Sequence, residues 1–233
     1  MNAVTPIPFD LVGFDLDGTL VDSAGDLGAA LNHALVLAGR SPVSLEAARS
    51  YVGGGTRVML ERALAANGGP LPDDRFEALL PQLVDYYAAH IAVHSTLYPG
   101  VTDMLQGLAD AGIKLALVTN KLERLAVKLL EELELSPHFY TIIGGDTLGH
   151  GRAKPAPDLL RLMMERSGLP APCAAYVGDT VYDSKAAQAA GLPVVLVDFG
   201  FSQVDVGTLG ANAVISHFDQ LMPALARIER IGA

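Results

Sequence analysis

Short apolar runs alternate along the chain with segments whose apolar residues recur every three or four positions. Each run ends in polar or small residues, and five of them predict buried strands, at 11–14, 114–118, 141–143, 174–177 and 194–197. Such runs are typical of a parallel sheet covered on both faces. Helical spacing predicts helices between them, at 101–110, 122–133, 158–167 and 184–190. The alternation predicts an α/β fold with a doubly wound, Rossmann-like parallel sheet.

One long segment, residues 22–93, breaks this alternation. It contains no convincing strand, and its apolar residues fall at helical spacing, as Leu27, Leu31 and Leu35 do. We therefore expect a small α-helical cap domain inserted after the first strand. The predicted domains are an α/β core of residues 1–21 and 94–233 and a cap of residues 22–93.

Composition and charge narrow the functional classes. The chain has 233 residues, half of them apolar, which suits one core with a modest insertion. A net charge of -10 and a pI near 4.9 argue against a protein that tracks a nucleic-acid backbone. No apolar run approaches the roughly 20 residues that cross a bilayer, and residues 1–8 lack a secretory signal. With Cys173 as the only cysteine, we expect a cytoplasmic protein without disulfides.

The sequence Phe14-Asp15-Leu16-Asp17-Gly18-Thr19 places two acids at the tip of the first predicted strand. Residues two apart on a strand project to the same face, so the carboxylates of Asp15 and Asp17 begin together, and Gly18 lets the chain turn away. Adjacent carboxylates repel each other unless a cation binds them. Mg²⁺ bound by such acids together with a substrate phosphate is the usual arrangement for phosphoryl transfer. An ordinary Asp-Gly turn is the alternative that this motif alone leaves open.

Three further strand ends carry residues that suit a phosphate. Ligands of an open parallel sheet bind where the strands end at their carboxyl edge. There the chain offers a hydroxyl, an amide, an ammonium in a proline-rich loop and two more acids, at Thr119, Asn120, Lys154, Asp179 and Asp183. Each alone is explained by a helix cap, a turn or an exposed loop. Together with the first motif they provide what a phosphoryl group needs while its phosphorus is attacked.

With these four motifs in this order, and a helical insertion between the first and the second, the chain resembles the haloacid dehalogenase superfamily of phosphatases. The resemblance covers nearly all of the chain. It implies Asp15 as the nucleophile, Asp17 as the general acid and base, and Thr119 and Lys154 as clamps on the phosphate. The residues alone do not say which of Asp15 and Asp17 attacks phosphorus; that assignment comes from the family.

The same resemblance implies a Mg²⁺ cofactor. Its expected ligands are Asp15, the main-chain carbonyl of Asp17 and Asp179, with Asp183 supporting them. In this scheme Asp15 attacks phosphorus to give an aspartyl phosphate, while the cation offsets charge on the phosphoryl oxygens. Asp17 protonates the leaving alkoxide and then takes a proton from the water that hydrolyses the intermediate.

The cap segment contains one stretch that is not helix-like, Tyr51-Val52-Gly53-Gly54-Gly55-Thr56-Arg57. Its exposed N–H groups suit an anion, and Arg57 adds a bidentate grip on a carboxylate; a flexible loop with a surface arginine is the alternative. Residues 52–64 resemble the cap segment of bacterial phosphoglycolate phosphatases. The resemblance implies 2-phosphoglycolate as the substrate, hydrolysed to glycolate and phosphate. Its expected contacts are Thr119, Asn120, Lys154, Gly54, Gly55 and Arg57.

Several other activities are weighed against this one. A phosphatase for another small phosphate ester, or a phosphoglucomutase-type phosphotransferase, uses the same core motifs. A phosphonoacetaldehyde hydrolase needs a cap lysine for a Schiff base, but no lysine precedes Lys114. A phosphorylatable signalling module has two acids at consecutive positions and no cap, whereas Asp15 and Asp17 are two residues apart, which counts against that class. The expected partner is a small phosphorylated carboxylate, with no nucleic acid and no membrane. We expect the protein to be a monomer or a homodimer.

Overall fold

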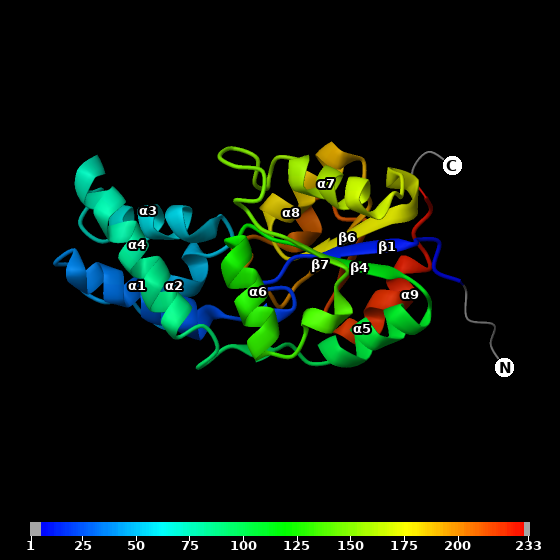
Figure 1. Ribbon diagram of the computed structural model, residues 1–233, viewed down its shortest axis with the longest axis horizontal. Helices are drawn as coiled ribbons and strands as arrows, with labels where there is room; N and C mark the ends of the chain where they lie inside the picture. Colours follow the sequence, from blue (N-terminus) through cyan, green and yellow to red (C-terminus); the bar gives the residue numbers. More distant parts are fainter. Residues whose placement is uncertain (1–5, 231–233) are drawn as a thin grey trace.

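A six-stranded parallel sheet forms the centre of the computed structural model, which describes residues 6–230 (Figure 1). Its strands are β1 Leu11–Phe14, β4 Lys114–Val118, β5 Thr141–Ile143, β6 Ala174–Gly178, β7 Val194–Val197 and β8 Ala213–Ile215. They run in the order β5-β4-β1-β6-β7-β8, and each neighbouring pair is parallel. The chain builds outward from β1 first to one side and then to the other, so the predicted doubly wound α/β fold is confirmed.

Helices cover both faces of the sheet. They are α5 Val101–Asp110, α6 Glu123–Glu132, α7 Asp158–Ser167, α8 Val181–Ala190 and α9 Leu221–Leu225, with short 3-10 helices at Ser136–His138, Ala171–Cys173, Val206–Thr208 and Phe218–Gln220. Because side chains alternate along a strand, Val12 and Phe14 pack with α5, α6 and α9, whereas Leu11 packs with α7 and α8. None of the helices in residues 6–230 combines the length and apolar character needed to cross a bilayer.

Four further helices lie together at one end of the molecule (Figure 1). They are α1 Ala24–Leu37, α2 Leu45–Tyr51, α3 Gly55–Ala66 and α4 Asp73–Ala89. Their apolar faces meet, and Leu31, Leu83 and Tyr87 are fully buried there. We call this group of helices, residues 24–89, the cap, and the rest of the described chain the core. The division into two domains at residues 22 and 93 stays a prediction.

The two chain crossings between the core and the cap are fastened to each other. Strands β2 Val21–Asp22 and β3 Thr96–Leu97 pair in antiparallel fashion, one on each crossing. Beside them the buried Asp26 carboxylate accepts hydrogen bonds from the backbone N–H groups of His94 and Ser95 and from the Ser95 hydroxyl. The apolar pattern of the sequence does not predict β2, β3, β8 or α9.

Candidate active site

The polar residues predicted at the strand ends meet at the carboxyl edge of the sheet. Strand β1 lies between β4 and β6, so the residues that follow these three strands are neighbours. Asp15 follows β1, Thr119 follows β4 and Asp179 follows β6. Lys154 reaches the same place from the loop before α7, and Asp183 reaches it from the first turn of α8. The structure therefore brings together residues from all four motifs.

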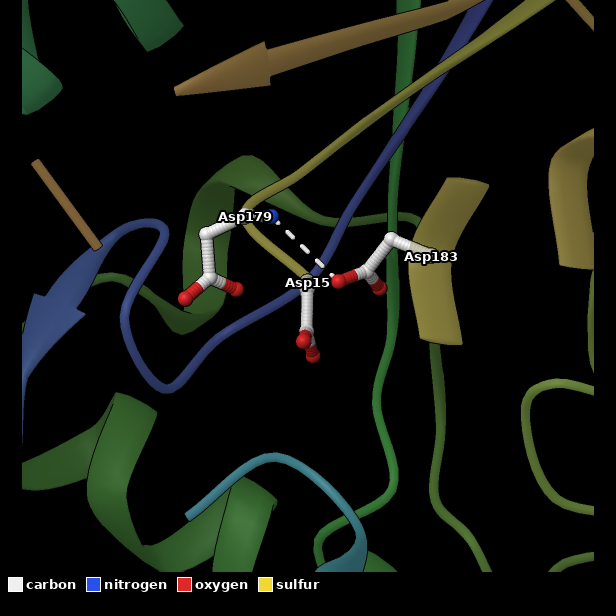
Figure 2. A group of neighbouring side chains, drawn as sticks. All are labelled: Asp15, Asp179 and Asp183. Carbon is white, nitrogen blue, oxygen red and sulfur yellow. Dashed lines mark hydrogen bonds between the residues drawn. The ribbon is translucent and has the colours of Figure 1, made fainter. Parts of the chain in front are cut away.

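Three carboxylates lie side by side in this site (Figure 2). Oxygens of Asp15, Asp179 and Asp183 lie within 4.8 Å of one another, and the three side chains are buried. Burial raises the pKa of Asp15 to about 6; Lys154 opposes the rise and Asp183 adds to it. Burial, then the charges of Asp183 and Asp15, raise the pKa of Asp179 well above its usual range. Crowded carboxylate oxygens of this kind fit a hard divalent cation.

The loops around Asp179 hold its carboxylate in one orientation. Oδ1 accepts a hydrogen bond from the Thr19 hydroxyl at 3.2 Å, and Oδ2 accepts one from the Phe201 backbone N–H at 2.7 Å. Gly18 has a φ of +85°, and a Cβ there would lie 2.2 Å from Asp179 Oδ2. Only glycine permits both this backbone conformation and this approach. The Asp17-Gly18 turn after β1 thus lets the loop that follows this strand pack against Asp179.

Lys154 is the buried cation of the acidic cluster. Its ammonium lies 3.0 Å from Asp15 Oδ1 and 2.6 Å from Asp183 Oδ1. It also donates to the Val118 carbonyl at 3.1 Å and to the Tyr176 hydroxyl at 2.8 Å. Burial alone would lower the pKa of Lys154, but the charges of Asp15 and Asp183 outweigh burial and raise it. Lys154 therefore stays positively charged beside the Asp15 carboxylate.

Asp183 is bound through one oxygen to Lys154 and through the other to the start of α8. Oδ1 accepts from Lys154, and Oδ2 accepts from the Thr180 N–H at 2.9 Å and the Thr180 hydroxyl at 2.7 Å, which caps α8. Burial would raise the pKa of Asp183, but Lys154 and Thr180 outweigh it and lower that pKa. This arrangement suits a supporting residue, whereas Asp15 and Asp179 directly follow strands β1 and β6.

Asp17 is not part of the acidic cluster and has a lysine of its own. Lys121 donates to its two oxygens at 2.9 and 3.0 Å, and the Ser23 hydroxyl donates to Oδ1 at 2.6 Å. Lys121 also donates to the hydroxyl of Tyr87, on cap helix α4, at 2.7 Å. Burial would lower the pKa of Lys121, but Asp17 and Tyr87 raise it to about 12. The strand-end motifs predict no role for Lys121, which directly follows Asn120.

A pocket lies between this edge of the sheet and the cap. The core contributes charged and polar residues, and the cap contributes small or apolar ones: Asp15, Asp17, Thr119, Asn120 and Lys121 from the core, and Leu27, Val52, Gly53, Gly55, Thr56 and Met59 from the cap. Asn120 joins the two sides, because its Nδ2 donates to the Gly53 carbonyl at 3.2 Å and to the Lys154 carbonyl at 2.9 Å. The cap therefore touches the core directly beside the pocket.

Two cap residues predicted to bind substrate, Gly54 and Arg57, are not among the residues that line this pocket. The Arg57 guanidinium donates to the two oxygens of Glu77 at 2.8 and 3.0 Å, and its side chain is 44% exposed. Helix α3 begins at Gly55, so Arg57 lies about 100° further round the helix than Thr56, which does line the pocket. The structure does not bring Arg57 to the place that the expected carboxylate grip requires.

Comparison with known proteins agrees with this geometry. A family model described as haloacid dehalogenase-like hydrolase matches residues 12–197, which include all four strand-end motifs and the cap. The chain belongs to this hydrolase family. Phosphoglycolate phosphatase from Caulobacter vibrioides is 42% identical to it over 207 residues, which are 89% of this chain and 86% of the relative. The enzyme of that name from Agrobacterium fabrum is 40% identical, over 91% of this chain and 90% of the relative.

Solved structures support the same assignment. The crystal structure of a predicted phosphoglycolate phosphatase from Haemophilus somnus matches the fold of this hydrolase with a TM-score of 0.87. The two chains are 29% identical, and the match covers 93% of this chain and 97% of the other. The resemblance read from the strand-end motifs is therefore confirmed, and the chain is an enzyme of the haloacid dehalogenase-like hydrolases.

Proposed function

We propose that this hydrolase is a Mg²⁺-dependent phosphatase that converts 2-phosphoglycolate to glycolate and phosphate. The observation that carries the proposal is the buried network of Asp15, Lys154 and Asp183 beside Asp179, of which Asp15 lines the pocket between the core and the cap. The relatives from Caulobacter and Agrobacterium bear the name phosphoglycolate phosphatase, which supports this substrate. We also propose that the enzyme is cytoplasmic and that it is a monomer or a homodimer.

The acidic cluster is the proposed Mg²⁺ site. Asp15 and Asp179, with the main-chain carbonyl of Asp17, would hold the ion, and Asp183 would keep Lys154 and Thr180 in place beside them. When bound, Mg²⁺ offsets negative charge on the phosphoryl oxygens. A cation here also favours the ionised form of the nucleophile, because it opposes the burial that raises the pKa of Asp15 to about 6.

In the first half-reaction Asp15 is the nucleophile. One of its carboxylate oxygens attacks phosphorus, the ester P–O bond breaks, and an aspartyl phosphate forms. Asp17 gives a proton to the leaving glycolate oxygen, which avoids release of an alkoxide. Lys154 and the Thr119 hydroxyl offset and orient the charge of the phosphoryl group during the transfer.

In the second half-reaction water replaces the Asp15 oxygen on phosphorus. Asp17 takes a proton from this water as the water oxygen bonds to phosphorus, and the bond between phosphorus and Asp15 breaks. Phosphate leaves and the Asp15 carboxylate is regenerated. The cap keeps bulk water out of the pocket, because Leu27, Val52 and Met59 cover it from that side.

The residues on the cap side of the pocket support a small carboxylate as the substrate. Gly53, Gly55 and Thr56 line the pocket where α3 begins, and the first N–H groups of a helix have no partners within it. Such a place suits the carboxylate of 2-phosphoglycolate. The apolar side chains around it leave no charged cap group among the lining residues that would favour a sugar phosphate or a nucleotide.

The experiment is Mg²⁺-dependent phosphate release from 2-phosphoglycolate, compared with glucose phosphates, nucleoside monophosphates and p-nitrophenyl phosphate, with EDTA as the control. We expect kcat/KM for 2-phosphoglycolate to exceed that for each other ester by at least about tenfold, and EDTA to abolish release. A preference for another ester would reject the substrate and keep the core chemistry. Full activity in EDTA would reject the metal-dependent mechanism.

A further inference from the structure

The ion pair between Lys121 and Asp17 is a part of the pocket that the two half-reactions above leave without a role. We propose that Lys121, held by Tyr87 of the cap, is a positioning residue that fixes the Asp17 carboxylate for the attack of water on the aspartyl phosphate. This inference rests on the proposed function, because it takes Asp17 as the base of the second half-reaction.

The hydrogen bonds of Asp17 fix the direction of its carboxylate. Lys121 binds both oxygens, at 2.9 and 3.0 Å, and Ser23 binds Oδ1 at 2.6 Å. The Lys121 side chain is only 3% exposed and that of Asp17 13%, so solvent screens this pair weakly. A base works when its lone pair is held toward the proton it removes, and three hydrogen bonds hold this carboxylate more firmly than a free side chain could be held.

Lys121 is in turn fixed by the cap. The hydroxyl of the fully buried Tyr87 accepts a hydrogen bond from its ammonium at 2.7 Å, and the ammonium lies 4.4 Å from the centre of the Tyr87 ring. Tyr87 belongs to α4, whereas Lys121 and Asp17 belong to the core. The network is therefore complete only when the cap lies where it does in this structure. The orientation of the Asp17 carboxylate thus depends on closure of the cap.

The charge of Lys121 stays in place during the step. Asp17 accepts the proton of water, the water oxygen bonds to phosphorus, and the bond from phosphorus to Asp15 breaks. Lys121 neither gives nor takes a proton. Direct binding of the substrate carboxylate is the competing role for Lys121, since Lys121 also lines the pocket. Its three N–H donors already have partners in Asp17 and Tyr87, which favours positioning.

The test separates the two half-reactions by rapid mixing with p-nitrophenyl phosphate and Mg²⁺. This ester has a good leaving group, so release of p-nitrophenol reports formation of the phosphoenzyme with little need for an acid. Steady-state release then reports its hydrolysis. The variants are Lys121→Met and Tyr87→Phe, which remove the ammonium and one hydroxyl. The matched control is Lys128→Met, because Lys128 also joins the core to α4, through the Ala88 carbonyl at 2.5 Å, yet does not touch Asp17.

We expect Lys121→Met to give a burst of about one p-nitrophenol per active site, followed by a steady rate about 10- to 100-fold below that of the unmodified enzyme. Tyr87→Phe should move the steady rate in the same direction by a few-fold, and it guards against misfolding of the lysine variant because it removes a single oxygen. Lys128→Met should behave as the unmodified enzyme. Adding Lys121→Met to Asp17→Asn should slow hydrolysis no further, because the lysine acts through Asp17.

Three results would overturn the inference. Equal loss in the burst rate and the steady rate would show that Lys121→Met damages the site generally. A raised KM for 2-phosphoglycolate alone, with unchanged hydrolysis of the phosphoenzyme, would make Lys121 a substrate ligand. Additive losses in the double variant would show action without Asp17. Failure of the proposed substrate is a separate result, seen as a phosphoenzyme from p-nitrophenyl phosphate but no release from 2-phosphoglycolate; absence of any phosphoenzyme would reject the aspartyl phosphate itself.

Discussion

The two sides of the pocket hold their functional groups in different ways. On the core side the charged groups are bound to one another in two networks, Lys154 with Asp15 and Asp183, and Lys121 with Asp17. On the cap side none of the lining residues is charged, and the glycine-rich loop presents its backbone. In the proposed mechanism the core therefore contains the groups that make and break bonds, and the cap contributes shape, closure and N–H groups.

The difference follows from rigidity. The core groups are positioned by the strands of one sheet. Hydrogen bonds along the length of these strands fix the places where the strands end. The cap loop touches the core through single contacts such as that of Asn120 with Gly53. Substitutions in the core should therefore change the chemical steps, whereas substitutions in the cap should mainly change substrate affinity.

Asp15→Asn should have the largest effect. An amide cannot attack phosphorus as the carboxylate does, so we expect phosphate release to fall at least about 10³-fold, with no phosphoenzyme detected. The fold should stay intact because the two side chains have nearly the same shape. Circular dichroism and phosphate release measure both properties. Asp10→Asn, at an exposed ion pair with Arg230, is the matched control, and activity close to normal in Asp15→Asn would contradict the covalent scheme.

Lys154→Met should reduce both stability and activity. Without the ammonium, Asp15 and Asp183 are left buried with no cation beside them in the metal-free protein. Removing one partner of a buried ion pair costs about 3–5 kcal/mol of unfolding free energy. Urea unfolding without Mg²⁺ measures the loss, with Lys185→Met, an exposed lysine on α8, as control. A loss below about 1 kcal/mol would mean that other groups neutralise these acids.

Binding of Mg²⁺ should weaken as the pH falls. Burial raises the pKa of Asp15 to about 6 in the metal-free protein, so Asp15 gains a proton as the pH drops through this value. The proton and the cation compete for the same oxygen, and the affinity should fall by up to about tenfold per pH unit below 6. Mg²⁺ binds most tightly when Asp15 is ionised. We therefore expect Mg²⁺ to stabilise the fold more near neutral pH than at pH values below 6.

Calorimetric titration with Mg²⁺ at about pH 7.5 and pH 5 tests this expectation. Asp179→Asn should weaken binding at both values, because it removes a second proposed ligand. An affinity that does not change between the two pH values would place the ion away from Asp15. Thermal unfolding with and without Mg²⁺ gives the same comparison without any substrate.

Most of the core side could be predicted from the sequence, because strand ends are visible in it. Asp15, Thr119 and Asp179 each follow an apolar run, and parallel topology places such ends together. The pairing of Lys121 with Asp17 could not be predicted in this way. It depends on how far a long side chain reaches across the edge of the sheet and on a tyrosine from another layer, and neither leaves a periodic signal.

The cap side was harder to predict for a related reason. The sequence shows that the glycines and Arg57 lie next to one another along the chain. The direction in which the Arg57 side chain points depends on the residue at which α3 begins. A start at Gly55 points Thr56 and Met59 into the pocket and Arg57 toward Glu77. The role of Tyr176 could not be predicted either. Its buried hydroxyl contacts Lys154, but its position in the sequence indicates only a residue of a strand.

Gly55→Ala should have a moderate effect that is confined to substrate affinity. Gly55 has a φ of +85°, and a Cβ there would lie 3.1 Å from the Asn120 carbonyl, so alanine should push the loop away from the core. We expect KM for 2-phosphoglycolate to rise about 3- to 10-fold with a smaller change in kcat. Gly69→Ala is the matched control, with a φ of +90° but nothing within 4 Å of the added Cβ. A change confined to kcat would instead tie this loop to the chemical steps.

Arg57→Ala should have the smallest effect, because the Arg57 guanidinium binds Glu77 at the surface of the cap rather than the pocket. We expect KM for 2-phosphoglycolate to change less than about twofold, and Glu77→Ala to match it, since an exposed ion pair contributes little. Steady-state kinetics of the two variants, with p-nitrophenyl phosphate as an ester that lacks a carboxylate, make the comparison. A tenfold rise in KM for 2-phosphoglycolate alone in Arg57→Ala, without one in Glu77→Ala, would mean that Arg57 leaves Glu77 to bind the substrate. The cap would then contribute charge as well as shape, and the contrast between the two sides of the pocket would hold only for the enzyme without substrate.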